Sequence, residues 1–589
     1  MIIARRCLGV AVVLSVLTVM MGCVYPVRPR NARGDDRQEG HDASSPPREP
    51  GGATTVSSED RTSHPSPPAG APVPPSPDNM RNRDILSEPL LQRKLVVAHH
   101  MTAWVGWPQA PGFARAFDPV PEGAAEDVVG TKSVCPMYGL VRDPPLVDLE
   151  KAVRHELKSA VRMGLDGFQF FYPIHMHDGF LRKYSRVVQT FIKEAEVHAP
   201  DFRVTLCLCA PGNPATEPEM RSQWAEHIRW ILADTAESPI WLRSPDGRLI
   251  VYTWVPEGFV DAFRGPDRPH IHHRAGIAAT AVAYEKLARE IGEEIAFIFH
   301  MRGRSDDAYA NLIYDYFPAA WRWTEGNMSE AAPRLAALAR KRERLFSPSV
   351  YPGFFGHTYK VGEKGGNGRG KVGEDPIDEL CRPYTKTQQT RLYRDLLEGA
   401  IKADSPLVSF ITWNDYTEAT QLIPEVNYSF ALGVLLNHYK NIWLDRPKRH
   451  DREIAIVSYK KHRIDRLLTT DVTLRVTNEK DYGTLEEESR IEVVTILKEP
   501  AEVHINGNNC GQAGAGIAST TIPFGPGPIR VQVKREGQDI LTLAPSEWAT
   551  NTPRRNDPVS VMLSTEFGRY FRDIYGAKAT PYTLREYAR

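Results

Sequence analysis

Residues 409–425 read SFITWNDYTEATQLIPE, and this stretch decides the fold that we expect for the chain. An apolar, β-branched run over residues 408–412 stops abruptly at Trp413-Asn414-Asp415, and a second carboxylate, Glu418, follows three residues later. A strand that ends in an aromatic, an amide and two acids is typical of the C-terminal end of a barrel strand, the face that carries the chemistry in (β/α)8 enzymes. Paired carboxylates beside an aromatic ring are also the side chains that cleavage of a glycosidic bond requires.

Short apolar strands alternate with amphipathic helices from about Leu95 up to this stretch. We expect strands over residues 95–100, 167–172, 203–209, 249–254, 295–300, 312–317, 348–354 and 407–412. We expect helices over residues 148–163, 181–198, 219–235, 275–291, 329–341 and 386–403. This pattern predicts an α/β fold, a (β/α)8 TIM barrel with insertions. An open, doubly wound sheet is the alternative, but no GxGxxG motif follows any expected strand.

The pattern changes again after about Arg446, where helical periodicity gives way to short strands. We expect strands over residues 453–457, 472–476, 491–496, 502–505, 529–533 and 559–563, with turn signals such as Asn506-Gly507 between them. Such a series predicts an all-β sandwich. It is either a carbohydrate-binding module or a packing partner of the barrel, and the lack of an evident aromatic platform favours the packing partner.

The first 23 residues have the pattern of an export signal. Arg5 and Arg6 precede an apolar segment that is too short to span a membrane comfortably. The segment ends at Met20-Met21-Gly22-Cys23, which resembles a bacterial lipobox with Met in place of the usual Leu. We therefore expect Cys23 to be lipidated and to anchor the exported chain in the bacterial cell envelope, at the outer membrane or on the periplasmic face. An ordinary signal peptide or an uncleaved anchor is the alternative.

Residues 24–86 are rich in Pro, Gly, Ser, Asp and Arg and contain few large apolar side chains. A segment of this kind buries too little apolar surface to offset its ordering entropy, so we expect a disordered, Pro-stiffened tether. The expected organisation is a signal peptide over 1–23, the tether over 24–86, the barrel over 87–446 and the sandwich over 447–589.

Overall composition gives no sign of a nucleic-acid partner, because 73 basic residues balance 73 acidic ones. The seven cysteines form neither a disulfide framework nor a zinc-binding spacing, and Cys207 and Cys209 are expected to be small core residues of one strand. We expect no cofactor.

Polar and aromatic residues recur where the expected strands end, and in a closed barrel these ends meet at one face. Rings that stack on sugar C–H surfaces, mixed with fixed polar groups for the hydroxyls, suit a carbohydrate. The candidate substrate-binding residues are His99, His100, Tyr172, His175, Trp254, His300, Tyr351, His357, Trp413 and Asn414.

Two other motifs suggest different chemistry. His175, His177 and Asp178 lie within four residues and could bind a metal, which would make the protein a metal-dependent hydrolase or deacetylase. No HExxH motif or distal ligand cluster accompanies them, so we favour hydrogen bonds to sugar and no metal. The Gly-rich stretch 365–370 (GGNGRG) lacks the Lys-Ser/Thr of a phosphate loop and is expected to form a lid.

The stretch around Trp413 resembles that of a known enzyme family. Trp413-Asn414-Asp415-Tyr416 with Glu418 is similar to the Trp-Asn-Asp-(Phe/Tyr)-Gly-Glu-Ser of glycoside hydrolase family 71, the endo-α-1,3-glucanases or mutanases, although Thr417 and Ala419 depart from it. The segments 96–100 and 165–168 also resemble that family's first two strands. Residues 414–421 are in addition similar to the Asn-Glu-Trp-His-Glu-Gly-Thr-Gln of family 99, the endo-α-mannosidases and mannanases.

The resemblance implies that Asp415 and Glu418 are the catalytic pair and, for family 71, that hydrolysis inverts the anomeric centre. We expect Glu418 to be the general acid, with its pKa raised by Asp415 and by apolar surroundings, and Asp415 to be the base that activates water. The reverse assignment stays open, as does a helix-capping role for the pair. The expected substrate is an α-linked glucan, with α-mannan second, and the competing class is a non-catalytic glycan-binding lipoprotein.

Overall fold

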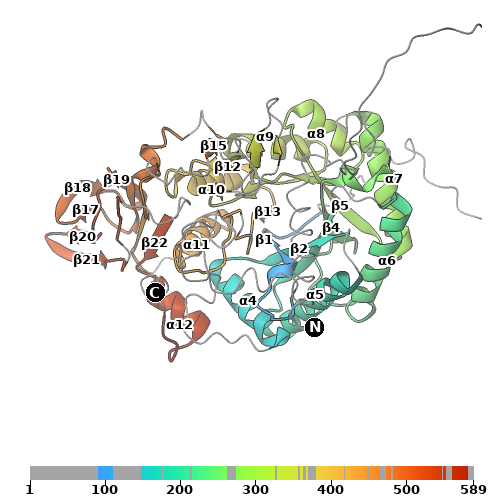
Figure 1. Ribbon diagram of the computed structural model, residues 1–589, viewed down its shortest axis with the longest axis horizontal. Coiled ribbons are helices and arrows are strands. Elements are labelled where there is room, and N and C mark those ends of the chain that lie inside the picture. Colours follow the sequence, from blue (N-terminus) through green and yellow to red (C-terminus); the bar gives the residue numbers. More distant parts are fainter. Residues whose placement is uncertain are drawn as a thin grey trace, which may run out of the picture.

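The computed structural model describes residues 90–110, 148–174, 178–210, 215–261, 273–324, 328–355, 359–361, 367–368, 380–416, 418–446, 452–464, 473–478, 482–546, 548–551 and 560–581. These residues form a parallel barrel with surrounding helices and, beside it, a second body of antiparallel sheets (Figure 1). Within them, no helix is both long enough and apolar enough to cross a membrane. The expected signal peptide, Cys23 and the tether lie outside the described residues.

The barrel strands follow one another in chain order around the sheet. They are β1 (Leu95–His100), β2 (Gly167–Pro173), β3 (Arg203–Cys209), β4 (Leu249–Trp254), β5 (Ile295–His300), β6 (Ala319–Trp321), β7 (Leu345–Ser347), β8 (Ser349–Val350) and β13 (Leu407–Phe410). Each pairs in parallel with its neighbour, and β13 returns to pair with β1.

Pro348 explains how this sheet closes into an eight-stranded barrel. It separates β7 from β8, which are two halves of one strand: β7 pairs with β6, and β8 pairs with β13 on the other side. Proline has no N–H to donate to the ladder, so the strand is interrupted there, while the Pro348 carbonyl still accepts from the backbone N–H of Ser409 at 2.9 Å. The predicted TIM barrel is confirmed, and the open-sheet alternative is wrong.

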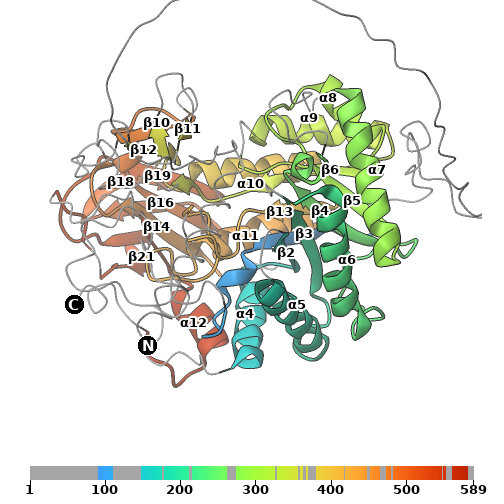
Figure 2. The same cartoon turned by 45° about the vertical axis from the view of Figure 1, so that its right-hand side comes forward.

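Helices cover the outside of the barrel (Figure 2). They are α4 (Leu149–Met163), α5 (Asp178–His198), α6 (Glu217–Ala233), α7 (Arg274–Ile291), α8 (Asp307–Tyr314), α9 (Met328–Lys341), α10 (Arg391–Ala403) and α11 (Ala431–Trp443). Local signals set their ends. Asp148 accepts from the Lys151 backbone N–H to cap α4, which stops at Gly164 in the left-handed region, and Thr216 with Glu219 forms a capping box on α6.

The sixth expected strand is wrong. Residues 312–317 (LIYDYF) lie at the end of α8 and just beyond it, and the real strand is the short β6 that follows Pro318. Asp315, which lies within that expected strand, is the C-cap residue of α8 and is paired with Arg342 at 2.6 Å and Arg274 at 2.9 Å. A short apolar run does not by itself distinguish a strand from a buried helix face.

An insertion between β8 and α10 forms a separate sheet. It contains β9 (Phe354–Phe355), β10 (Tyr359–Val361), β11 (Asn367–Gly368) and β12 (Leu380–Thr385), and β15 (Thr473–Val476) joins it in parallel with β12. The segment 472–476 was expected to be a strand of the C-terminal sandwich, and instead its described part, β15, extends a sheet that belongs to the barrel's insertion. Backbone hydrogen bonds thus cross the expected boundary at residue 446.

The C-terminal body contains two four-stranded antiparallel sheets. One has the order β19 (Gly516–Ile522), β16 (Ile491–Leu497), β14 (Ile454–Lys460), β22 (Ser560–Ser564), and the other β18 (Asn508–Ala513), β17 (Ala501–Ile505), β20 (Val531–Arg535), β21 (Gln538–Leu543). Side chains of both sheets share one buried core, for example Val457, Val493, Val503 and Val533, as expected for a sandwich.

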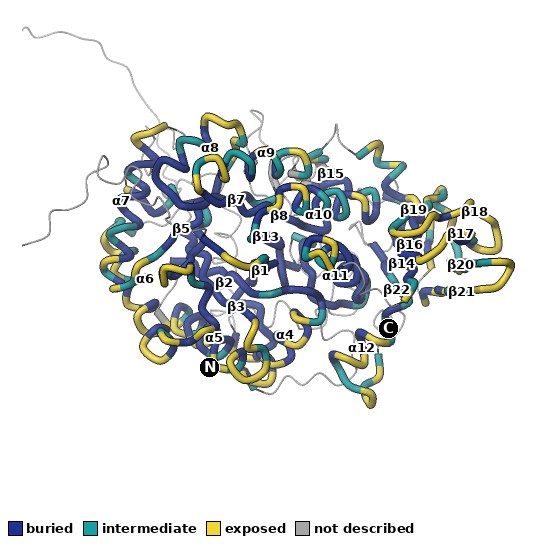
Figure 3. Tube along the Cα trace, turned by 180° about the vertical axis from the view of Figure 1, so that it is seen from behind, coloured by how far each residue is buried: buried dark blue, intermediate teal, exposed yellow. Residues whose placement is uncertain are grey.

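The other face of the first sheet packs on the barrel. Ile456 and Ile496, which point away from the sandwich core, belong to the same apolar core as the barrel helices. The second sheet is the outer one and carries more exposed residues (Figure 3). The expected all-β region also contains a helix, α12 (Phe567–Tyr575), which packs on α4 with Arg162 against Tyr570 and Asp573.

Candidate active site

The turn after β13 places the two candidate acids. Thr412 Oγ1 accepts the backbone N–H of Asp415 at 2.8 Å, and Asp415 Oδ1 accepts the backbone N–H of Glu418 at 3.2 Å. The Thr412 N–H donates to the Thr420 carbonyl at 2.8 Å, and the two threonine hydroxyls lie 3.1 Å apart. Thr and Asp favour such local side-chain-to-backbone bonds over continued regular structure, so the strand stops here in a compact turn.

The Glu418 carboxyl group is more deeply buried than the residue as a whole. Its Oε2 atom is inaccessible to solvent and has no hydrogen-bond partner among the described residues, although the residue overall is only half-buried. Burial raises the pKa of Glu418 well above its ordinary value, the negative charge of Asp415 adds to this, and a hydrogen bond with the Trp323 side chain opposes it. A carboxyl group in these surroundings favours its protonated form, which a general acid needs.

Rings from successive strand ends gather beside these acids. The His99 ring at the end of β1 lies 4.9 Å from Trp323, just beyond β6, and 5.7 Å from Phe171 in β2. Trp254, the last residue of β4, lies 5.8 Å from Trp323 and 6.3 Å from His300, the last residue of β5. Because Trp323 also contacts the Glu418 carboxyl, the rings and the acid form one cluster at the C-terminal face of the barrel.

Both histidines of this cluster are held neutral. Burial lowers the pKa of His99 to about 3, and the nearby Gln169 side chain opposes the shift. Burial also lowers the pKa of His300 well below its ordinary value, and nearby arginines add to the effect. His300 Nδ1 lies 3.3 Å from the Val255 backbone N–H and accepts from it, so the neutral ring carries its proton on Nε2. That buried Nε2 has no partner among the described residues and is available to donate.

A third carboxylate lies near the rings. Glu257, in a short 3-10 helix over Pro256–Phe259, accepts from Arg302 at 2.8 Å through one oxygen, and its other oxygen is buried without a described partner. The helix follows Val255, which adopts a φ of +50°. A left-handed backbone is strained for a β-branched residue, and such strain clusters at functional sites.

Four candidate substrate-binding residues instead make structural contacts. The His100 ring and the Trp413 indole bond the buried Glu156 of α4 at 2.8 and 3.0 Å. The Tyr172 hydroxyl lies 2.5 Å from Ser185 of α5. Asn414 bonds the backbone of Met101 through both its oxygen and its nitrogen. Alternate residues of a strand point to opposite faces, so His99 and His100 cannot both face the barrel interior, and His100 points to the helices.

Of the remaining candidates, Tyr351 makes a structural hydrogen bond, and the others lie outside the described residues. The Tyr351 hydroxyl donates to the Thr324 carbonyl at 3.2 Å and so holds the segment next to Trp323. His175, His177 and His357 lie outside the described residues, as does the predicted lid apart from Asn367 and Gly368. The described residues hold no group of three or more His, Cys, Asp or Glu side chains placed to bind a metal.

Trp323 is the site residue that the sequence analysis missed. It lies two residues beyond Trp321, the last residue of β6, and both rings are in contact at 5.7 Å. The signal was the Trp-x-Trp spacing, since period two keeps both side chains on one face. It went unnoticed because β6 was assigned to residues 312–317.

Comparisons with known proteins give little further information. No model of a known protein family matches the chain, and no curated protein does. Among solved structures, a GH99 endo-alpha-mannosidase from Bacteroides thetaiotaomicron is 12% identical, with a TM-score of 0.37 over 61% of this chain and 98% of that one. A glycoside hydrolase-like protein is 11% identical, with a TM-score of 0.37 over 62% and 99%. A Bacteroides uniformis beta-glucuronidase is 12% identical, with a TM-score of 0.37 over 71% and 45%. Similarity at these levels carries no argument about activity.

Proposed function

We propose that the protein is a glycoside hydrolase that cleaves an α-linked polysaccharide, with endo-acting cleavage of α-1,3-glucan as the first candidate reaction. The observation that carries the proposal is the Glu418 carboxyl group, which lies beside Asp415 and Trp323 and has a buried oxygen with no hydrogen-bond partner among the described residues. A buried acid next to a second carboxylate and to aromatic rings is the arrangement that glycosidic cleavage needs.

In this mechanism Glu418 donates its proton to the glycosidic oxygen as the C–O bond breaks, and the bonding electrons leave with that oxygen. Asp415 takes a proton from water while the water oxygen attacks the anomeric carbon. One water is consumed, and both carboxyl groups regain their starting protonation state after proton exchange with solvent. The transition state resembles an oxocarbenium ion. Inversion of the anomeric centre is part of the proposal through the resemblance to family 71.

The rings supply recognition. The Trp254 and Trp323 faces suit the C–H surfaces of a sugar, and the Nε2–H of neutral His300 suits a hydroxyl or ring oxygen. His99 and Gln169 occupy paired positions of β1 and β2 at the same end of the barrel. We therefore place the reacting sugar between these side chains and Glu418.

A product screen tests the reaction. Wild-type protein, Asp415→Asn and Glu418→Gln are incubated with α-1,3-glucan and with α-mannan, and reducing ends are counted. Asp539→Asn, an exposed carboxylate on the outer sheet, is the control. We expect the rate of each active-site variant to be about 10²–10⁴-fold lower than that of the wild type, and the rate of the control to be unchanged. Equal turnover by all four proteins would refute the assignment.

Three other outcomes separate the alternatives. Cleavage of α-mannan but not of α-1,3-glucan would favour the second resemblance, to the family 99 mannanases. Binding of a glycan without turnover by the wild type would show a non-catalytic glycan-binding protein. Loss of wild-type activity in chelator would favour the metal-dependent reading of His175, His177 and Asp178.

We also propose that the protein is anchored to the bacterial envelope through lipid on Cys23, with residues 24–86 as the tether. The support is the lipobox-like sequence that ends at Cys23. Labelling with an alkyne fatty acid in wild-type and Cys23→Ser cells tests this. Lipid on the wild type alone is expected, and label on neither protein would refute the anchor.

A further inference from the structure

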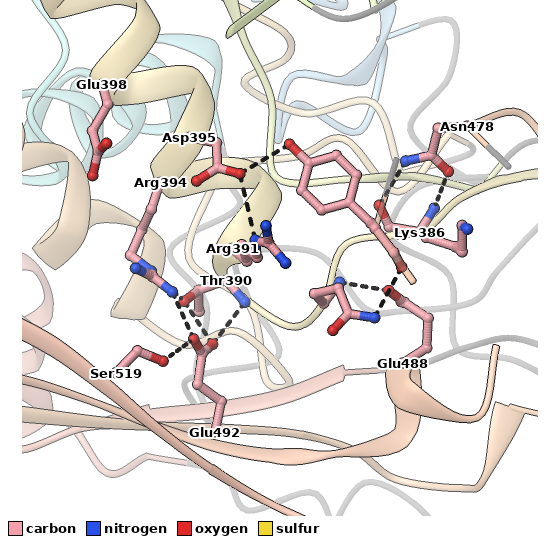
Figure 4. A network of polar contacts seen from close by, with 12 residues as sticks. Lys386, Thr390, Arg391, Arg394, Asp395, Glu398, Asn478, Glu488, Glu492 and Ser519 are labelled. Atoms are coloured by element: carbon pink, nitrogen blue, oxygen red, sulfur yellow. Dashed lines mark hydrogen bonds and ion pairs between the residues drawn. The ribbon is translucent and has the colours of Figure 1, made fainter. Parts of the chain in front are cut away.

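A buried glutamate of the C-terminal region holds the insertion that follows β8. Glu488, in a short 3-10 helix over Glu487–Ser489, accepts from the Tyr384 hydroxyl of β12 and from the Gln388 backbone N–H, both at 2.5 Å. Its side chain lies in the polar network of Figure 4, on the side nearer Lys386 and Asn478. Hydrogen bonds to a buried carboxylate are among the strong ones, so this contact fixes Tyr384 firmly.

Tyr384 in turn packs against the residue that is bonded to the turn carrying Asp415 and Glu418. β12 pairs with β9 so that Tyr384 faces Phe355, and the two rings meet edge to face at 6.3 Å. The Phe355 backbone N–H donates to the Glu418 carbonyl at 2.9 Å. Ala419, which adopts a φ of +52°, packs against the same apolar cluster of Phe355, Tyr384 and Ile464.

A polar and an apolar set of contacts therefore run from the C-terminal region to the turn that carries Glu418, and both include Tyr384 and Phe355. One is polar, from Glu488 through Tyr384 and the β12–β9 pairing to the Phe355 N–H. The other is apolar, because Ile464 and Leu485 of the C-terminal region complete the cluster on which Ala419 rests. At the other end of the turn, the Trp413 backbone N–H donates to the His99 carbonyl at 2.7 Å, and Asn414 bonds the Met101 backbone. The Phe355 bond therefore ties the Glu418 end of the turn to a different segment from the one that holds the Trp413 end.

We propose that Tyr384 and Phe355 are positioning residues through which the C-terminal sandwich holds the Glu418 carboxyl group in place for the proposed reaction. This inference rests on the proposed function for its catalytic part. The sandwich then serves to position a residue of the active site, rather than to bind carbohydrate as a separate module.

The chain contains a matched control at the same interface. Glu492 of β16 is also buried, and it accepts from the Thr390 hydroxyl at 2.7 Å and the Thr390 backbone N–H at 2.9 Å (Figure 4). Thr390 precedes α10 and has no described contact with the turn that carries Glu418. Tyr384→Phe and Thr390→Val thus each remove one hydroxyl group that donates to a buried glutamate of the sandwich. Of the two residues, only Tyr384 contacts the segment that is bonded to Glu418.

Hydrogen–deuterium exchange of the full chain, read by mass spectrometry, tests positioning without any substrate. We expect Tyr384→Phe to increase the exchange rate at least fivefold in peptides that cover residues 411–423, and Thr390→Val to leave those peptides unchanged. Equal exchange in the two variants, or none above wild type in Tyr384→Phe, would overturn the proposal. If Tyr384→Phe does not fold, Ile464→Val, which thins the apolar contact by one methyl group, is expected to give the same local increase.

Kinetics supply the second readout. On a substrate that the wild type cleaves, Tyr384→Phe is expected to lower kcat about tenfold with KM within twofold, and Thr390→Val to change neither. Faster exchange with an unchanged kcat would refute the catalytic part of the inference. A wild type that cleaves no glycan would refute the proposed function instead, and the exchange result would still decide whether the sandwich holds the turn.

Discussion

Asp415 acts on Glu418 in two ways at once. Its Oδ1 accepts the Glu418 backbone N–H at 3.2 Å, and its charge helps to raise the pKa of the Glu418 carboxyl. The same side chain therefore places the acid and favours its protonated form. A spacing of three residues allows both, because a short Asp side chain reaches the backbone of the residue that closes its own turn.

Asp415→Asn separates the two effects. The amide oxygen can still accept from the Glu418 N–H, but the negative charge is gone, so we expect the pKa of Glu418 to fall while the turn is kept. Carbon-13 NMR of labelled glutamate measures this titration in the wild type and the variant. A Glu418 titration that does not move would contradict the assigned charge coupling.

Glu418→Gln should remove activity and yet stabilise the fold. A carboxyl whose pKa is raised by folding binds more protons in the native than in the unfolded state, so stability declines as pH rises from the unfolded pKa to the folded one. Each unit of elevation corresponds to about 1.4 kcal/mol. At neutral pH we therefore expect the variant to unfold at a higher temperature than the wild type. Calorimetry at pH 7 and pH 4 checks this, and an equal gain at both pH values would be inconsistent with the argument.

The two buried histidines predict acid sensitivity of the opposite sign. With the pKa of His99 lowered to about 3, the unfolded chain binds a proton that the native ring does not, between that value and the ordinary pKa of 6.5. Stability should then decline as pH falls through this window, with a slope of about 1.4 kcal/mol per pH unit for each histidine. We expect His99→Gln to reduce the slope by that amount, measured by urea unfolding from pH 4 to 6.5. A variant with the wild-type slope would show that His99 does not carry the effect.

Substitutions at Trp413 and Trp254 should have different effects, the first on stability and the second on substrate binding. Trp413→Phe removes a donor to the buried Glu156 and is expected to cost about 1–3 kcal/mol of stability, with KM unchanged. Trp254→Phe removes ring area at the candidate site and is expected to raise KM about tenfold with little loss of stability. Denaturant unfolding and steady-state kinetics of both variants provide the comparison. The reverse pattern would place the substrate at Trp413.

The sequence was sufficient where local pattern and tertiary contacts agree. The strands β1 to β5 were found within one residue of their bounds, because each is a continuous apolar run between amphipathic helices. The split strand around Pro348 and the three-residue β6 were misplaced, because both depend on closure of the barrel rather than on an apolar run of their own. In the same way, β15 reads as one more strand of the sandwich, and only its partner β12 shows where it belongs.

Only some of the predicted site residues lie at the candidate site. The ends of β1 to β5 were visible in the sequence, but the alternation of side-chain direction along each strand was not used. His99, Trp254 and His300 lie in the ring cluster, whereas His100, Tyr172 and Trp413 bond to residues of the surrounding helices. Counting alternate positions from His99 would have assigned His100 to the outer face. The partners themselves, such as Glu156 in the middle of α4, carry no local sign of their role.

The first turn of α10 is completed by a carboxylate from β16, since Glu492 accepts from the Thr390 N–H that precedes the helix. A nascent chain leaving the ribosome therefore presents all eight barrel strands before the group that finishes this helix has been made. Until the sandwich strands have been made, the barrel leaves uncovered the apolar surface on which Ile456 and Ile496 later pack.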